Sequence, residues 1–418
     1  MHSPEYGATA PPLVLHAPLP FRRFGGYPLV FDQAGNAGPY PLIFISAAEA
    51  SADRHGAALI RAARNQCPSI RFVGVAGPEM VAEGCDRIFD FTGHAAMLAG
   101  AVGAVGRGVA MLRTADRHLR RYGFHGAVVI DSPTLHLPLA ARAQAAGVPV
   151  MYYIAPQVWA WGQYRTAKLR ERFDRVAVIL PFEEPFLRQH GVNATYVGHP
   201  LAEQVASQTA DAPAVKTIKA GAEYVIALLP GSRRHVIREV LPGQLEVAER
   251  IASALPGVRF VVSIANTASE PWINHLAAGC RADVRTYLGR FAELIAAADL
   301  VLVASGTAAL EVAFHRRPMI VMYNVSPLFY HFLARWLIRT RYLSLPNILA
   351  GREVVPEFMP YYRSTVPIAE RAVELLRFPQ QRQAMTDELA AIVEPLRGTQ
   401  ASVHAAAMLL EMVNRRRT

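Results

Sequence analysis

The sequence is poor in cysteine, because its 418 residues contain only Cys67, Cys85 and Cys280. The odd number leaves one thiol unpaired, and the spacing matches no metal-ligand motif. This usage is typical of a protein in a reducing cytosol, and it predicts no metal site built on cysteine.

Long apolar runs are also missing. The longest stretch without a charged residue is 143–164, whose 22 residues include Pro149, Pro156 and three glutamines. A membrane-spanning helix needs about 20 predominantly apolar residues, which neither this stretch nor 318–334 provides. The amino terminus lacks a basic region followed by an apolar core, so we expect no signal peptide. We therefore expect a protein that is soluble or lies on a membrane without crossing it.

Acidic residues are outnumbered: 33 Asp and Glu stand against 43 Lys and Arg, which gives a net charge of +10. This excess predicts an acidic partner, such as phosphate groups, nucleic acid or an anionic membrane surface. The cations are spread along the chain, with no long Lys/Arg block and no aromatic-interleaved RNA motif. We therefore expect phosphate groups or a membrane surface as partners and no nucleic acid.

Short apolar runs alternate with helical stretches twice along the chain, a pattern typical of parallel strands buried between helices. It covers 41–205 and restarts at 221–395 after a polar stretch at 204–220. We predict an α/β protein with two Rossmann-like, doubly wound domains over these two ranges. Residues 1–40 are expected to form an irregular extension and 396–418 a terminal helix. The predicted strands are 41–47, 71–77, 127–132, 148–155, 175–181, 194–200, 224–231, 259–266, 284–289, 300–306 and 318–324.

Ligands of such sheets bind outside the carboxyl ends of the strands, so the loops there are the places to look for function. In IALLPGSRRHVIREVLP (226–242), a strand, a tight turn and a helix start follow one another. Gly231 allows close approach of a ligand, Ser232 can cap the helix, and Arg233 suits a diphosphate. The alternative is an ordinary strand–helix turn with solvated arginines.

A second turn repeats this arrangement in LVASGTAALEVAFHRRP (302–318). Ser305, Gly306 and Thr307 open a helix, and Glu311 follows one helical turn later, where a carboxylate can accept two ribose hydroxyls. A buried helix with one exposed glutamate is the alternative. Two such turns in one sheet favour a nucleotide more than either does alone.

The first half offers acidic candidates after its first strand. AAEASADRHGA (47–57) supplies Glu49, Ser51 and Asp53. These groups are well placed to receive the hydroxyls of an acceptor, or they simply cap a helix.

Further candidates follow later strands of the first half. VVIDSPTLHLP (128–138) places Asp131 at the mouth of a strand with His136 close behind, which suggests acid–base chemistry. Trp159 in APQVWAW and His199 in VGHP are candidates for ligand contact. Their alternative roles are packing in the core and a structural histidine.

SPLFYHFLARWLIRTRYLSLPNILAGREVVPE (326–357) begins with an amphipathic, basic stretch. The membrane-contact candidates in it are Phe329, Phe332, Arg335, Trp336 and Arg339. Aromatic side chains on one face and arginines near anionic headgroups are typical of an interfacial helix. A helix that packs on its own domain is the alternative.

Taken together, these stretches resemble the bacterial lipid-A-disaccharide synthase family over about residues 41 to 415. The resemblance is carried by RFVGVAGPEM, PQVWAW, VGHPLAE, LLPGSR, ASGTAALE and above all SLPNILAGREVVPE. It implies the GT-B fold, in which two Rossmann-like domains face each other across a cleft. It also implies an inverting glycosyltransferase that joins UDP-2,3-diacylglucosamine to 2,3-diacylglucosamine 1-phosphate. The implied products are the β-1′,6-linked lipid A disaccharide 1-phosphate and UDP.

The resemblance implies a setting as well as a reaction. Members are peripheral proteins on the cytoplasmic face of the Gram-negative inner membrane, without a tightly bound catalytic metal, and we expect no other cofactor. It further suggests a homodimer that exchanges C-terminal segments, with 396–418 packing back on its own chain as the alternative.

Roles for individual residues follow from the same resemblance. Asp131 stands at the essential aspartate of the family, so we expect it to act as the base or to orient the acceptor, with Glu49 and Asp53 as further catalytic candidates. Ser51, Trp159 and His199 are acceptor-side candidates.

On the donor side, the resemblance implies that Arg233 faces the UDP diphosphate, Ser305 to Thr307 the phosphates and Glu311 the ribose. Asn347 and Arg352 fall in the family signature near the donor.

Departures from the family pattern are concentrated in the first half. Ala48 and Ala52 stand where the family has glycine, Gly103 where it has glutamate, and Thr134-Leu135-His136 where it has Asp-Phe-Asn. Three functions therefore stay open: a working synthase with a drifted acceptor side, a related UDP-sugar-dependent glycosyltransferase with another lipid acceptor, and a non-catalytic nucleotide-binding relative.

Overall fold

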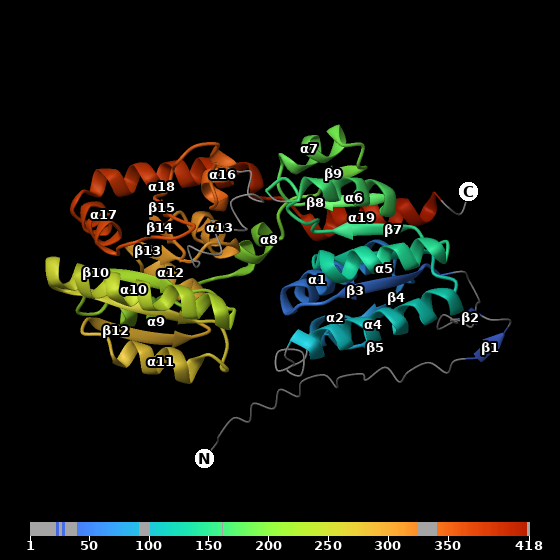
Figure 1. Ribbon diagram of the computed structural model, residues 1–418, viewed down its shortest axis with the longest axis horizontal. Helices are drawn as coiled ribbons and strands as arrows, with labels where there is room; N and C mark the ends of the chain where they lie inside the picture. Colours follow the sequence, from blue (N-terminus) through green and yellow to red (C-terminus); the bar gives the residue numbers. More distant parts are fainter. Residues whose placement is uncertain are drawn as a thin grey trace, which may run out of the picture.

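Two parallel β-sheets form the framework of the protein, one in each of two lobes (Figure 1). The computed structural model describes residues 22–24, 27–29, 40–91, 101–160, 162–324 and 341–415. Both sheets are wrapped by helices that connect their strands, so the predicted pair of doubly wound α/β halves is confirmed.

The N-terminal sheet has the strand order β5-β4-β3-β6-β7-β8-β9. Its strands are β3 (Leu42–Ala47), β4 (Arg71–Val75), β5 (Asp86–Phe89), β6 (Gly126–Ile130), β7 (Val150–Tyr153), β8 (Arg175–Val178) and β9 (Ala194–Tyr196). All five residues of β6 are buried, as expected for a central strand covered on both faces. The edge strand β5 was not predicted, because its residues are exposed or half-buried and form no apolar run.

Helices cover both faces of this sheet. They are α1 (Ala50–Gln66), α2 (Pro78–Ala82), α4 (Ala101–Arg121), α5 (Pro133–Ala145), α6 (Thr166–Arg172) and α7 (Glu183–Gln189), with a 3-10 turn at Gln163–Arg165. α1 packs Leu59 and Ile60 against one face, while α4 and α5 pack Met111 and Leu139 against the other. The short antiparallel pair β1 (Arg22–Phe24) and β2 (Tyr27–Leu29) lies within the segment that we expected to be irregular.

The C-terminal sheet has the order β12-β11-β10-β13-β14-β15. Its strands are β10 (Tyr224–Leu229), β11 (Val258–Ile264), β12 (Asp283–Leu288), β13 (Leu300–Val303), β14 (Met319–Met322) and β15 (Glu357–Phe358). Its helices are α10 (Arg234–Ala254), α11 (Glu270–Ala278), α12 (Phe291–Ala297), α13 (Thr307–Phe314), α16 (Leu345–Ala350), α17 (Val366–Arg377) and α18 (Pro379–Val393), followed by a 3-10 turn at Glu394–Leu396. The two-residue strand β15 lies inside the signature string and was not predicted.

The chain passes between the lobes twice (Figure 1). The polar stretch 204–220 contains the end of α8 (Pro200–Ser207) and all of α9 (Ala212–Lys219). After α18 the chain returns, and α19 (Ala401–Asn414) packs on α1, with Leu409 and Val413 in the core of the N-terminal lobe. Glu203 in α8 holds the start of α19, because its carboxylate accepts hydrogen bonds of 2.8 Å from both the backbone N–H and the hydroxyl of Ser402.

Candidate active site

The two glycine turns predicted to bind phosphate follow neighbouring strands of the C-terminal sheet. β10 and β13 pair directly, with Leu229 opposite Val303, so the turns lie at the same edge. Gly231 has φ of 96° and Gly306 has φ of 130°, a backbone region that strains any residue with a Cβ. α10 and α13 begin at this edge, and the free N–H groups of their first turns suit an anion.

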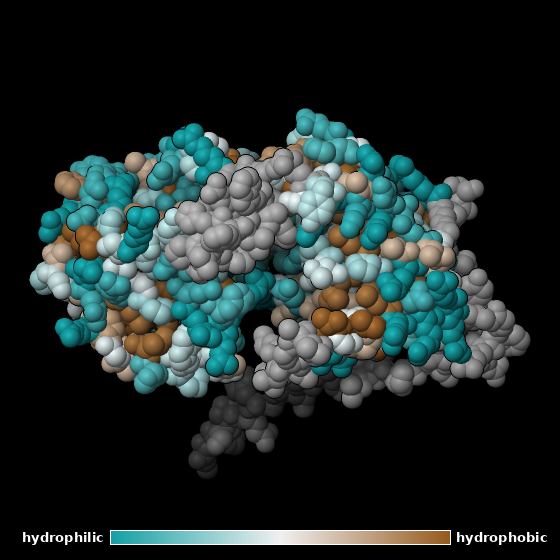
Figure 2. Space-filling view, viewed as in Figure 1, coloured by the Kyte–Doolittle hydropathy of each residue, from teal (hydrophilic) through white to brown (hydrophobic). Residues whose placement is uncertain are grey.

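An ion pair joins the two lobes at this edge. A terminal guanidinium nitrogen of Arg233, the residue before α10, donates to Oε2 of Glu49 at 3.1 Å. Glu49 immediately precedes α1 and follows β3 of the other sheet. The two side chains are 65% and 46% exposed, so the pair is open to solvent. Figure 2 shows a hollow between the lobes. The carboxyl ends of the two sheets therefore face each other here.

Asp131 lies at the end of β6, beside β3 in the same sheet. Burial raises the pKa of its carboxyl group, a hydrogen bond from the N–H of Ser132 lowers it, and the charges of Glu49 and Arg233 act on it in opposite directions. Asp131 is therefore close to the ion pair between the lobes. A carboxyl group with a raised pKa is suited to take up a proton from a hydroxyl.

His136 does not form an acid–base pair with the Asp131 carboxylate. Its ring is fully buried, and Nδ1 lies 2.5 Å from the backbone carbonyl oxygen of Asp131. Burial lowers the pKa of His136 to about 4, so the ring is neutral at cellular pH. The acid–base pair that their proximity in the sequence suggests is not formed, because the histidine contacts the main chain.

Glu311 lies half-buried in α13, where burial raises its pKa to about 7. The Arg54 guanidinium, in α1 of the other lobe, lowers this pKa and offsets part of the rise. Tyr323 follows β14, and its pKa is raised to about 12 by burial and by a hydrogen bond with Glu239, while nearby Arg233 lowers it. The sequence reasoning missed Arg54 and Tyr323. Only the position of Tyr323 at the carboxyl end of the predicted strand 318–324 could have indicated it.

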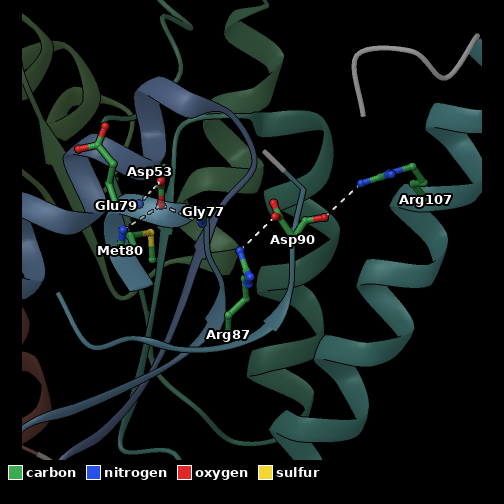
Figure 3. A network of polar contacts seen from close by, with 7 residues as sticks. All are labelled: Asp53, Gly77, Glu79, Met80, Arg87, Asp90 and Arg107. Atoms are coloured by element: carbon green, nitrogen blue, oxygen red, sulfur yellow. Dashed lines mark hydrogen bonds and ion pairs between the residues drawn. The ribbon is translucent and has the colours of Figure 1, made fainter. Parts of the chain in front are cut away.

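Asp53 has a structural role instead of the predicted catalytic one. Its side chain is buried, and its carboxylate accepts hydrogen bonds from the backbone N–H groups of Gly77, Glu79 and Met80 at 2.8, 2.9 and 3.2 Å (Figure 3). These donors are the free groups at the start of α2. The carboxylate thus ties α1 to α2.

The remaining positions of interest near the start of α1, and the departures from the family pattern, show no backbone strain. Ser51 lies half-buried in the first turn of α1. Ala48 and Ala52, which replace glycines of the family pattern, are buried and are not among the residues with positive φ. Gly103 lies in α4. The replacement of the two glycines therefore causes no left-handed strain in this chain.

Trp159 and His199 are buried and have partners within the protein. The indole N–H of Trp159 donates to the carboxylate of Glu183 at 2.8 Å. Nδ1 of His199 accepts the N–H of Leu201 at 3.1 Å and so caps α8. Burial lowers the pKa of His199 to about 3. These contacts favour the structural roles over the predicted acceptor contacts.

Asn347 is fully buried, and its amide is saturated. Its nitrogen donates to the carbonyl of Val355 and to Glu357, both at 2.9 Å, and its oxygen accepts the N–H groups of Val354 and Val355. No further hydrogen bond is left for UDP. Asn347 therefore shapes the signature loop, and this corrects our prediction that it binds the donor.

Arg352, the second donor-side residue of the signature, is turned toward α18. Its guanidinium forms an exposed ion pair with Glu388. The side chain thus contacts a helix of its own lobe, and a contact of Arg352 with UDP stays a prediction.

The predicted membrane-contact residues Phe329, Phe332, Arg335, Trp336 and Arg339 lie outside the described residues. Within the described parts of the chain, no helix has the length and apolar character needed to cross a bilayer. Those same parts contain no group of three His, Cys, Asp or Glu side chains arranged to hold a metal ion.

Comparison with known proteins gives a consistent result. The family model described as "Lipid-A-disaccharide synthetase" matches residues 43–410. A lipid-A-disaccharide synthase of Nitrosococcus oceani is 37% identical over 360 residues, which cover 85% of this chain and 92% of that protein. UDP-GlcNAc 2-epimerase from Neisseria meningitidis, solved with UDP-GlcNAc, has a TM-score of 0.55 at 12% identity and covers 90% of this chain and 99% of its own. MurG of Acinetobacter baumannii has a TM-score of 0.54 at 13% identity, and the match covers 89% of this chain and 99% of the MurG chain. The predicted GT-B fold is thereby confirmed.

Proposed function

Because the chain belongs to the lipid-A-disaccharide synthase family, we propose that it transfers 2,3-diacylglucosamine from UDP to 2,3-diacylglucosamine 1-phosphate. The products are the β-1′,6-linked disaccharide 1-phosphate and UDP. One observation carries the proposal at the level of the site: Asp131 and Glu49 of one lobe lie close to Arg233 of the other. An acceptor base and a cation for the diphosphate are thus available on opposite sides of one cleft.

The donor half supplies the electrostatic part of the reaction. We infer that the UDP diphosphate lies across the turns at Gly231 and Gly306, where it meets Arg233 and the first N–H groups of α10 and α13. Negative charge grows on the diphosphate as it leaves, and fixed positive groups at this position stabilise the transition state. Glu311 is the candidate for the ribose hydroxyls.

The acceptor half supplies the base. The 6-hydroxyl oxygen of the acceptor attacks the anomeric carbon from the side opposite UDP, and a new C–O bond forms there. The bond between that carbon and the diphosphate oxygen breaks, and UDP leaves with the electron pair. The hydroxyl proton passes to the carboxylate of Asp131. Attack from the opposite side inverts the configuration, which gives the β linkage.

Contact with the inner membrane is a second part of the proposal, because both substrates carry acyl chains. The net charge of +10 supports attraction to an anionic surface. Figure 2 shows hydrophobic surface on the N-terminal lobe, which also carries α4. On that helix Val105 and Val109 are 68% and 41% exposed, and Arg113 and Arg117 are exposed as well. We propose peripheral binding at the cytoplasmic face through this lobe and, from the sequence, through 326–342.

A homodimer remains a proposal that rests on family resemblance. In the single chain α19 packs on its own N-terminal lobe. Light scattering of the purified protein measures whether a second chain is bound.

Release of UDP tests the proposed reaction. The purified protein is incubated with UDP-diacylglucosamine, with and without diacylglucosamine 1-phosphate. We expect UDP only when the acceptor is present, and a loss of about 100-fold or more in kcat for Asp131→Asn, since the amide cannot take up the proton. UDP release with a different lipid acceptor only, or UDP binding without turnover on any acceptor, would contradict the proposal.

A further inference from the structure

The main chain at the end of β6 has an unusual conformation. Asp131 and Ser132 are consecutive residues with positive φ, 55° and 49°, and neither is glycine. Residues with a Cβ rarely adopt this region, and two in succession persist only where the surroundings hold them. The direction of the Asp131 side chain depends on this backbone, so whatever holds the backbone also sets the carboxylate.

Two donors converge on the carbonyl oxygen of Asp131. Nδ1 of His136 lies 2.5 Å from it, and the hydroxyl of Tyr152 donates to it at 3.0 Å. Tyr152 comes from β7, the strand next to β6, and its side chain is fully buried. A carbonyl oxygen only accepts hydrogen bonds, so the His136 proton must sit on Nδ1.

The other ring nitrogen of His136 is fixed in consequence. With Nδ1 protonated and the ring neutral, Nε2 has no proton and can only accept. Its partner is the hydroxyl of Ser46 at 2.9 Å, which must therefore donate. Ser46 lies in β3, the strand on the other side of β6, and is fully buried. Both strands that flank β6 thus contribute a side chain to one chain of hydrogen bonds.

We propose that Ser46, His136 and Tyr152 are positioning residues that hold the main chain of Asp131 in its left-handed conformation and so aim its carboxylate at the acceptor. The inference rests on the proposed role of Asp131. Ser46 fixes the imidazole tautomer, the imidazole and the phenol fix the carbonyl, and the carbonyl fixes the peptide from which the side chain projects. None of the three touches substrate in this account, and none changes charge during the reaction.

His136 stands where the family pattern has asparagine, and this substitution offers a rescue variant. The side-chain nitrogen of asparagine can occupy nearly the position of Nδ1 and donate to the same carbonyl. Leucine fills the site without a donor. His136→Asn should therefore retain the function that His136→Leu loses, which a requirement for packing alone would not produce.

The test compares kcat and KM for Ser46→Ala, Tyr152→Phe, His136→Leu and His136→Asn. Tyr153→Phe is the matched control, because Tyr153 is an equally buried neighbour on β7 that contacts Asp131 through its main-chain carbonyl, which accepts the Asp131 N–H at 3.2 Å and is unchanged in the variant. The hydrogen bonds that Ser46, His136 and Tyr152 make toward the Asp131 carbonyl form a relay. Loss of one hydrogen bond of this relay should lower kcat about 10-fold, and His136→Leu should lower it about 100-fold. KM for both substrates should stay within about twofold. His136→Asn and Tyr153→Phe should stay within about threefold of the unchanged protein.

Two outcomes separate this inference from the proposed function. If the protein turns over, Asp131→Asn abolishes turnover, and the relay variants match Tyr153→Phe in kcat, the relay is wrong and the function stands. Nitrogen NMR of the His136 ring tests the relay whether or not the protein turns over. We expect a proton on Nδ1 and none on Nε2 from pH 5.5 to 8.5. A ring protonated on Nε2 would overturn the relay even in an inactive protein.

Discussion

Replacing Arg233 by alanine should separate ligand binding from stability. Its ion pair with Glu49 is 3.1 Å long, but the two side chains are 65% and 46% exposed. An ion pair this accessible to water contributes less than about 1 kcal/mol to the free energy of unfolding. A charge-assisted hydrogen bond to a diphosphate contributes about 2–3 kcal/mol to binding. The variant should therefore bind UDP about 30- to 150-fold more weakly while unfolding at nearly the same denaturant concentration.

Two further variants make this result specific. Glu49→Gln removes the same ion pair from the other side but leaves the guanidinium free, so UDP should bind as tightly as before or more tightly. Arg250→Ala removes an exposed arginine from α10, the helix that Arg233 immediately precedes. Arg250 pairs with Glu246 at 2.9 Å, and UDP binding should not change. Together they distinguish loss of the cation from loss of the ion pair and from loss of any arginine on α10.

Titration calorimetry with UDP measures the affinities, and urea unfolding measures the stabilities. The reasoning fails if Arg233→Ala binds UDP like the unchanged protein. It also fails if Glu49→Gln loses as much affinity as Arg233→Ala, because the ion pair between the lobes would then matter and the cation itself would not.

Three further predictions concern residues with structural roles. Asp53→Asn should lower the free energy of unfolding by about 2–4 kcal/mol, because an amide N–H replaces an oxygen facing three backbone donors; a change below about 0.5 kcal/mol in urea unfolding would contradict this. Asn347→Ala should lower it by a similar amount, about 2–4 kcal/mol, by leaving buried main-chain groups without partners, and UDP affinity at low temperature should be kept. Burial lowers the pKa of His199 from 6.5 to about 3, so the unfolded chain protonates this ring at a higher pH than the folded chain does. The stability that the neutral ring contributes is therefore fully present above pH 6.5 and is lost as the pH falls toward 3. Between pH 7 and pH 5 the unchanged protein should therefore lose about 2 kcal/mol more than His199→Asn, which keeps an acceptor for the helix cap; equal losses would show that His199 is not buried as described.

The fold could be predicted from the sequence because buried parallel strands leave a clear pattern. Strands such as β6, whose residues are all buried, appear as continuous β-branched runs between helical stretches. Strands at the edges leave no such pattern. The half-exposed β5 and the two-residue β15 were missed. Each is a strand only because it hydrogen-bonds to one neighbouring strand, and its residues are not buried enough to form an apolar run.

The site was only partly predictable, for a similar reason. Gly231 and Gly306 are local signals, because a turn with positive φ requires glycine regardless of the rest of the fold. The bonds that a polar side chain makes depend on residues far away in the sequence. Asp53 is held by the start of α2, Arg352 by Glu388, and His136 by Ser46, which lies 90 residues away. Residue type and spacing suggest chemistry for all three, but only the tertiary contacts show that their polar groups have other partners.

The product of the reaction tests the central claim most directly. The protein is incubated with UDP-diacylglucosamine and diacylglucosamine 1-phosphate, and the lipids are analysed by mass spectrometry alongside the UDP released. We predict one disaccharide 1-phosphate for each UDP, with the β-1′,6 linkage seen by NMR, and no product from Asp131→Asn. A stoichiometric release of UDP without this disaccharide, or a product with the α linkage, would contradict the account.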